Sequence, residues 1–224
     1  MSVKIAENIV LDKFTAVDFL VNGSDGRILL SDISWNLYET FLEDFAERPG
    51  WKLTYDEGKL EIMPPTPEHK EYSFSFHDFV RAYCDEFEIN LEGRRSTTFR
   101  SEFLNKGIEP DECYYIQNAD KIIGKKISAE DFPVPDVAVE VDITTESLDK
   151  FPIYAALQVS EVWIYDGKNL AIYELTKDEY KKISKSKAMP KLSAADLLKF
   201  LKISREKGQT KGLKEFRKWL NKLK

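Results

Sequence analysis

The chain has 224 residues, 42% hydrophobic and 12% aromatic, which is enough to bury a core without a disulfide or metal staple. Its two cysteines, Cys84 and Cys113, lack CxxC spacing, which argues against a disulfide scaffold or a cysteine-ligated zinc site. The net charge is −6, and neither a signal peptide nor an apolar run of the roughly 20 residues needed for a membrane span occurs, so we expect a cytoplasmic protein.

The first half of the sequence predicts two helices that flank a hairpin. Leu37, Phe41 and Phe45 recur every four residues, which predicts a helix over about 34–46. Segments 51–56 and 59–63 flank a Glu-Gly pair that favours a hairpin turn. A proline-rich stretch follows, and then a long helix over about 68–87.

The second half predicts strands with helices between and after them. We expect strands near 96–103, 109–117 and 137–143, a helix over 150–158, and a hairpin of 161–165 with 170–175. Helices over about 193–203 and 211–222 end the chain. This order predicts an α/β (α+β) fold in which helices flank a mixed β-sheet, with extra hairpins and a C-terminal helical appendage.

Charge separates the end of the chain from its body. Residues 199–224 hold ten Lys or Arg and two Glu, a charge of +8, whereas the remainder carries −14. We therefore divide the chain into an N-terminal segment 1–30, a core domain 31–190 and a basic helical extension 191–224. The terminal helix has three open roles: docking on the core, contact with a DNA backbone, or binding of a partner subunit.

The strand over 137–143 holds the first candidate site residues. Because side chains alternate along a strand, Val137, Val139 and Val141 face one side, while Asp136, Glu140 and Asp142 face the other with Ala138. Burial of unpaired carboxylates is costly, so a cation should compensate them unless this face is exposed to solvent.

Two further residues complete the constellation. Asp111 opens a predicted strand directly after Pro110, and Lys150 begins the helix after the carboxylate strand, with Tyr154 and Gln158 on its helical face. Carboxylates on neighbouring strands can hold Mg²⁺, with Mn²⁺ as a substitute, and such an ion activates water and offsets phosphodiester charge. Lys150 can orient the attacking water or stabilise the developing charge.

At this point the sequence resembles the bacterial Uma-two "putative restriction endonuclease" family of the PD-(D/E)xK nuclease superfamily, over about residues 33–175. The resemblance is carried by Gly58-Lys59-Leu60-Glu61-Ile62-Met63-Pro64-Pro65 and His69, Glu109-Pro110-Asp111, Pro135-Asp136-Val137-Ala138-Val139-Glu140-Val141, Asp149-Lys150, and Tyr154-Ala155-Ala156 through Glu161-Val162-Trp163.

The resemblance implies a restriction-endonuclease-like core and a Mg²⁺-dependent endodeoxyribonuclease. Asp111 would be the PD aspartate and Glu140 the second acidic residue, both of them catalytic and metal-binding. The E-x-K lysine position holds Asp142, so Lys150 is the expected substitute. Thr54 stands where the first hairpin often carries an acid, and Glu61, Glu68 and Glu71 remain open as replacements.

Around this site, Asp136, Asp142, His69, Tyr154 and Gln158 are possible supporting residues. His69 at a helix start has the alternative of a local hydrogen bond. The expected partners are double-stranded DNA and a second copy of the chain in a homodimer. The alternatives are a catalytically degenerate nuclease fold that binds nucleic acid or protein, and a metal-free carboxylate-pair hydrolase such as a glycosidase.

Overall fold

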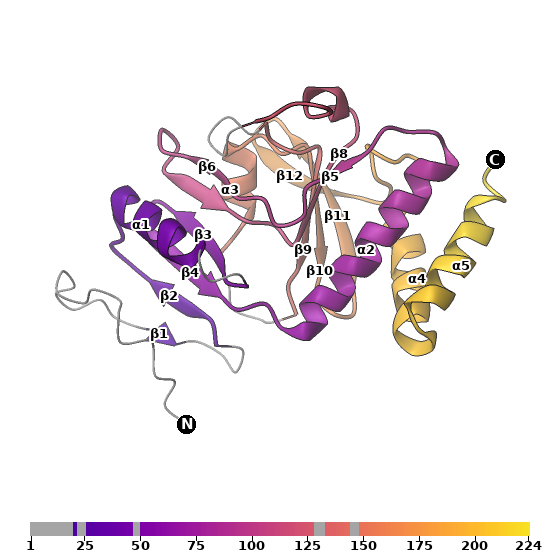
Figure 1. The fold of residues 1–224 in the computed structure, drawn as a ribbon, viewed down its shortest axis with the longest axis horizontal. Helices are drawn as coiled ribbons and strands as arrows, with labels where there is room; N and C mark the ends of the chain where they lie inside the picture. Colours follow the sequence, from indigo (N-terminus) through magenta and orange to yellow (C-terminus); the bar gives the residue numbers. More distant parts are fainter. Residues whose placement is uncertain (1–19, 22–25, 47–49, 128–132, 144–147) are drawn as a thin grey trace.

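The computed structural model describes residues 20–21, 26–46, 50–127, 133–143 and 148–224. They form a mixed α+β fold in which helices cover two β-sheets (Figure 1). The first sheet has the strand order β1-β2-β4-β3-β7-β6, and the second has the order β12-β11-β10-β9-β8-β5. The expected α/β (α+β) fold with flanking helices and a C-terminal helical appendage is confirmed.

The first sheet contains β1 (Leu20–Val21), β2 (Ile28–Leu30), β3 (Lys52–Asp56), β4 (Lys59–Met63), β6 (Phe99–Ser101) and β7 (Lys106–Ile108). Within the described residues its strands pair antiparallel throughout, and the predicted hairpin is its β3–β4 pair. The sequence predicted one mixed sheet, so the second sheet is a correction. Alternating apolar residues identify strands but do not specify which distant strands pair.

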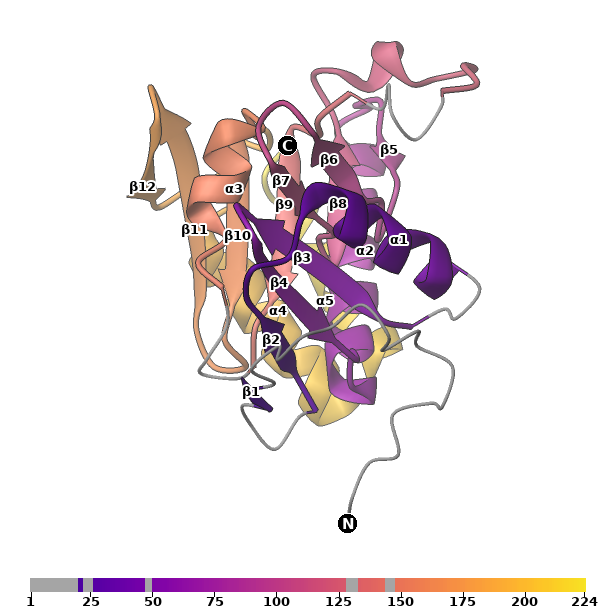
Figure 2. The ribbon, with the colours of Figure 1, turned by 90° about the vertical axis from the view of Figure 1, so that its left-hand side faces the viewer.

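Helix α1 (Trp35–Ala46) covers this first sheet (Figure 2). Tyr38 of α1 stacks on Tyr55 of β3 at a ring-centroid distance of 4.7 Å. The hydroxyl of Tyr38 lies so near Gly107 of β7 that a Cβ added there would be only 2.1 Å from it. Glycine is therefore the residue that lets α1 and β7 approach this closely.

The second sheet contains β5 (Glu92–Gly93), β8 (Glu112–Tyr115), β9 (Val137–Val141), β10 (Glu161–Tyr165), β11 (Leu170–Thr176) and β12 (Glu179–Ile183). Strand β9 pairs in parallel with β10 and antiparallel with β8, which makes the sheet mixed. Helix α3 (Phe151–Ala156) lies between β9 and β10 in the chain, as a parallel connection requires. A short 3₁₀ helix, η2 (Ala119–Lys121), follows β8.

Helices α2 (Pro67–Glu86) and α4 (Ala194–Lys207) cover one face of the second sheet, and α5 (Gln209–Leu220) packs on the outer side of these two helices (Figure 1). Thr66 caps α2, with Pro67 in its first turn, and Ser193 caps α4. Val137, Val139 and Val141 belong to the hydrophobic core beneath these helices. The other face of β9 points toward α3 and the first sheet.

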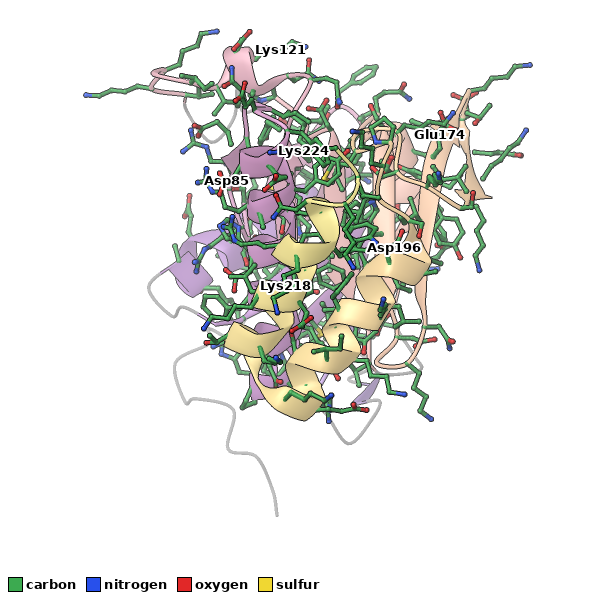
Figure 3. All side chains as sticks on the ribbon, turned by 90° about the vertical axis from the view of Figure 1, so that its right-hand side faces the viewer. Asp85, Lys121, Glu174, Asp196, Lys218 and Lys224 are labelled. Atoms are coloured by element: carbon green, nitrogen blue, oxygen red, sulfur yellow. The ribbon has the colours of Figure 1, made fainter. Side chains whose placement is uncertain are left out.

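The basic terminal helix docks on the core of its own chain (Figure 3). Phe216 and Leu220 of α5 are fully buried, and Phe216 packs against Phe79 of α2 at 4.8 Å between ring centroids. Acidic residues of α2 also pair with the tail, as in Arg217–Asp85 at 3.4 Å. Such exposed pairs contribute little, so the aromatic contacts hold the helix in place.

The division into 1–30, 31–190 and 191–224 remains a prediction. Most of segment 1–30 lies outside the described residues, and α4 and α5 share one hydrophobic core with α2 and the second sheet. No helix in the described part of the chain is long and apolar enough to cross a membrane.

Candidate active site

The site begins on β9, where the valine-rich strand turns one carboxylate away from the helical core. All five residues of β9 are buried, so the alternative of a solvent-exposed strand face does not apply. Ala138 packs in the second hydrophobic core with Cys113 of β8, and Glu140 follows on the same face with 2% exposure.

Asp111 lies beside Glu140 on the neighbouring strand. Strand β8 pairs Glu112 with Val139 and Cys113 with Ala138 in antiparallel register, and one step further brings Asp111 opposite Glu140. The backbone N–H of Asp111 donates to the Val139 carbonyl at 3.0 Å, which fixes that register. Two buried carboxylates therefore meet across two adjacent strands.

Asp111 is held as a carboxylate by cations and hydrogen bonds. Its Oδ1 accepts from Lys52 Nζ at 2.5 Å, and its Oδ2 accepts from the backbone N–H of Val141 at 2.7 Å. Burial acts to raise the pKa of Asp111, but the ammonium groups of Lys52 and Lys150 outweigh it and hold the pKa below its ordinary value.

Glu140 is held by two groups from the region of α3. Its Oε2 accepts from Lys150 Nζ at 2.7 Å, and its Oε1 accepts from the Tyr154 hydroxyl. Burial raises the pKa of Glu140, and Lys150 opposes this shift. Burial lowers the pKa of Lys150, but the carboxylates of Glu140, Asp142 and Glu61 outweigh it and raise that pKa above its ordinary value.

The first sheet closes the site with charged residues of its own. Arg27 NH1 lies 3.3 Å from Glu61 Oε2, and Arg27 NH2 lies 3.6 Å from Asp142 Oδ1. Glu61 of β4 stands opposite Thr54 of β3 and is 2% exposed. Of the three acids left open for the first hairpin, Glu61 is thus the buried one, and Glu68 instead pairs with Arg205 at the surface.

Sequence reasoning did not find Lys52 and Arg27, and it took Glu109 only as part of the PD motif. Burial, together with Asp111 and Glu140, raises the pKa of Glu109 to about 7 against the effect of Lys52. The alternation of side chains along β3 could have pointed to Lys52, because it places Lys52 on the same strand face as Thr54, which pairs with Glu61. No local pattern indicates that this hairpin packs onto Asp111.

His69 also approaches the site from the first turn of α2. Its Nδ1 accepts from the Thr66 backbone N–H at 3.4 Å and lies 2.7 Å from the Thr66 hydroxyl, so the local hydrogen bond weighed for it exists. Burial lowers the pKa of His69, and the nearby charges that also act on that pKa are Asp111, Lys52, Asp142 and Lys150.

Two of the predicted supporting residues lie elsewhere. Asp136 accepts from the backbone N–H groups of Ile116 at 2.7 Å and Asn118 at 2.9 Å, at the opposite end of β9 from Glu140. Gln158 lies beyond the end of α3 and donates to the Ala155 carbonyl at 2.8 Å. Both line a separate cavity of about 640 Å³.

The donor set of Asp111 and Glu140 fits a hard divalent cation. No group of three or more His, Cys, Asp or Glu side chains suited to a metal occurs among the described residues. Mg²⁺ needs fewer, because it is usually bound through one or two carboxylates and keeps several waters. In this structure each carboxylate has an ammonium partner, Lys52 for Asp111 and Lys150 for Glu140, which compensates its charge.

Comparison with protein families matches residues 38–204 to the Uma2 family, described as "Putative restriction endonuclease". The chain belongs to this family. The resemblance drawn from the sequence is therefore confirmed, and the matched segment runs from within α1 to within α4 and includes Asp111, Glu140 and Lys150.

A solved structure similar to this chain is described as a putative nuclease belonging to DUF820 from Anabaena variabilis ATCC 29413. It shares 17% sequence identity, the alignment covers 71% of this chain and 98% of that one, and the TM-score is 0.49. A comparison with curated proteins finds no match.

Proposed function

We propose that this member of the Uma2 family is a metal-dependent endonuclease that hydrolyses phosphodiester bonds of double-stranded DNA. The observation that carries the proposal is the buried pair Asp111 and Glu140, set opposite each other on adjacent strands, each with a lysine on one carboxylate oxygen. Family membership supports the same chemistry.

Asp111 and Glu140 are the residues that would hold Mg²⁺, or Mn²⁺ in its place. The bound ion would lower the pKa of a water molecule and offset the negative charge of the phosphate. Hydrolysis forms a bond from the water oxygen to phosphorus and breaks one phosphorus–oxygen ester bond, which leaves a phosphomonoester and an alcohol.

The chain's own cations would act on the phosphate. Lys150, held by Glu140 at 2.7 Å, occupies the role of the missing E-x-K lysine. Lys52 reaches the same carboxylate pair from the first sheet. An ammonium group aimed at the charge that develops on phosphate oxygens is typically worth about 10²–10³ in rate.

One observation favours the alternative of a degenerate, binding-only protein. Asp142 brings negative charge to the usual lysine position, and both site carboxylates are already compensated by lysines. In that case the chain would bind nucleic acid without cleaving it. Cleavage and binding must therefore be measured side by side.

The test is plasmid cleavage with Mg²⁺ or Mn²⁺ and with EDTA, alongside duplex binding by fluorescence anisotropy. We expect cleavage that EDTA abolishes, and a loss of at least 10²-fold in Asp111→Asn and Glu140→Gln. Glu112→Gln is the matched control, because Glu112 is a buried carboxylate next to Asp111 whose Oε2 lies 3.6 Å from His77 Nδ1 instead of near Glu140. Binding without cleavage under every metal would establish the alternative.

A further inference from the structure

We propose that His69 is a substrate-binding residue whose Nε2–H donates a hydrogen bond to a non-bridging oxygen of the scissile phosphodiester. The inference rests on the proposed function and assigns this histidine a direct contact with DNA. It follows from three features: the tautomer of the ring, the lack of a partner for Nε2, and the charges that surround it.

The tautomer follows from the contacts of Nδ1. The Thr66 backbone N–H can only donate, so Nδ1 accepts at 3.4 Å and carries no proton in the neutral ring. The Thr66 hydroxyl, 2.7 Å away, accepts from the backbone N–H of His69 and can turn its own hydrogen toward Nδ1. The ring proton of neutral His69 is therefore on Nε2, which makes Nε2 a donor.

This donor is buried without a partner. His69 is 2% exposed, and its Nε2 finds no hydrogen-bond partner within the described part of the chain. Buried donors are normally paired, so an orphaned one points to a missing acceptor. His69 follows β4, whose last residue Met63 pairs with Lys52 in the sheet, and Lys52 contacts Asp111, so the acceptor belongs in the candidate active site.

A phosphate oxygen is the acceptor that best fits these surroundings. Lys52 and Lys150 attract an anion to the site, and the 20-residue helix α2 directs the positive end of its dipole there. A metal does not fit Nε2, because a protonated ring nitrogen has no free lone pair to coordinate it.

Two substitutions separate substrate binding from helix capping. The amide nitrogen of His69→Gln reaches the Nε2 position and keeps the donor, whereas that of His69→Asn reaches only the Nδ1 position next to Thr66. We expect His69→Asn to lose roughly 10- to 100-fold in kcat/KM, the scale of one hydrogen bond to a charged group, and His69→Gln to stay within a few-fold of wild type. A purely structural role predicts equal rates for the two variants, because the amide oxygen of either one can accept from the Thr66 backbone N–H, Gln as a usual third residue of a capping box.

A second measurement does not depend on cleavage. The chain has only two histidines, so long-range ¹H–¹⁵N spectra of the imidazoles resolve His69 from His77, which pairs with Glu112 on the opposite face of the sheet. Titration with the dinucleotide thymidylyl-thymidine in Ca²⁺ should shift the His69 Nε2 signal and leave His77 unchanged.

The outcomes distinguish the two proposals. A His69 shift in a protein that cleaves no DNA supports the phosphodiester contact and contradicts the nuclease activity. DNA cleavage with an unmoved His69 signal and equal rates in His69→Asn and His69→Gln overturns the His69 contact and leaves the nuclease proposal standing. A signal that moves equally for both histidines also overturns it.

Discussion

Replacement of Lys150 by methionine tests the electrostatics of the site without shortening the side chain much. Glu140 is 2% exposed and would lose the ammonium group that lies 2.7 Å from its Oε2. Removal of one partner of a buried ion pair typically costs about 3–5 kcal/mol, because the remaining charge is left uncompensated. Tyr154 still donates to Glu140, so we expect about 3 kcal/mol.

Urea unfolding at pH 8 in EDTA measures this loss in the free energy of unfolding. Glu140→Gln and the Lys150→Met/Glu140→Gln double variant complete a double-mutant cycle, with an expected coupling of about 2–3 kcal/mol. The double variant should recover much of the stability because it buries no unpaired charge. Lys211→Met is the control, since its pair with Glu215 is exposed to solvent and contributes little to stability.

Magnesium adds a third arm to the experiment. If a cation binds at Asp111 and Glu140, it replaces the lost ammonium and stabilises Lys150→Met by about 2.7 kcal/mol at a hundredfold excess over its Kd. A Lys150→Met variant that matches the Lys211→Met control in EDTA, with no response to Mg²⁺, would refute both the buried pair and the metal site.

Three further predictions concern Glu109, Gly107 and Phe103. Burial raises the pKa of Glu109 to about 7 from its ordinary value of 4.5, so the folded chain binds the extra proton and stability falls as pH rises between these values. In EDTA, Glu109→Gln should remove this dependence, worth about 3 kcal/mol, and an unchanged pH profile of unfolding would contradict the shift. Gly107→Ala should lower the free energy of unfolding by about 1–3 kcal/mol, since its Cβ would meet the Tyr38 hydroxyl, and a neutral effect in thermal melts would show that α1 can move away. Light scattering should give the mass of a homodimer, because double-strand cleavage needs two active sites. Phe103 is 95% exposed at a hairpin turn, so Phe103→Ser should shift the measured mass toward that of a monomer. A wild-type monomer at high micromolar concentration would contradict the homodimer.

The local pattern of the sequence was sufficient for most elements of the fold. The helix over 34–46, the hairpin of 51–56 with 59–63 and the helix over 68–87 lie within one or two residues of the observed bounds. The pairing of the strands was harder to predict from the sequence. The region 96–117 forms three strands in two different sheets, because β6 and β7 join the hairpin whereas β8 joins β9.

The sequence placed Asp111, Glu140 and Lys150 on elements that the fold brings together. Alternation gives the face of a strand but not the distance along it: Asp136 lies four residues from Glu140, about 13 Å along the strand, and serves a different loop. The predicted position of Gln158 on the helical face of Lys150 was wrong, because α3 ends at Ala156 and Gln158 has a φ of 62°. Lys52 and Arg27 depend on contact between two sheets, which no local pattern encodes.

The most direct test of the central claim is a crystal of the protein soaked in Mn²⁺ and measured for anomalous scattering. We expect one anomalous peak between Asp111 and Glu140, within about 2.0–2.6 Å of an oxygen from each carboxylate. Asp111→Asn should remove that peak, and Glu112→Gln should retain it. No peak at this position, or a peak only in the separate cavity lined by Asp136 and Glu161, would contradict the proposed metal site.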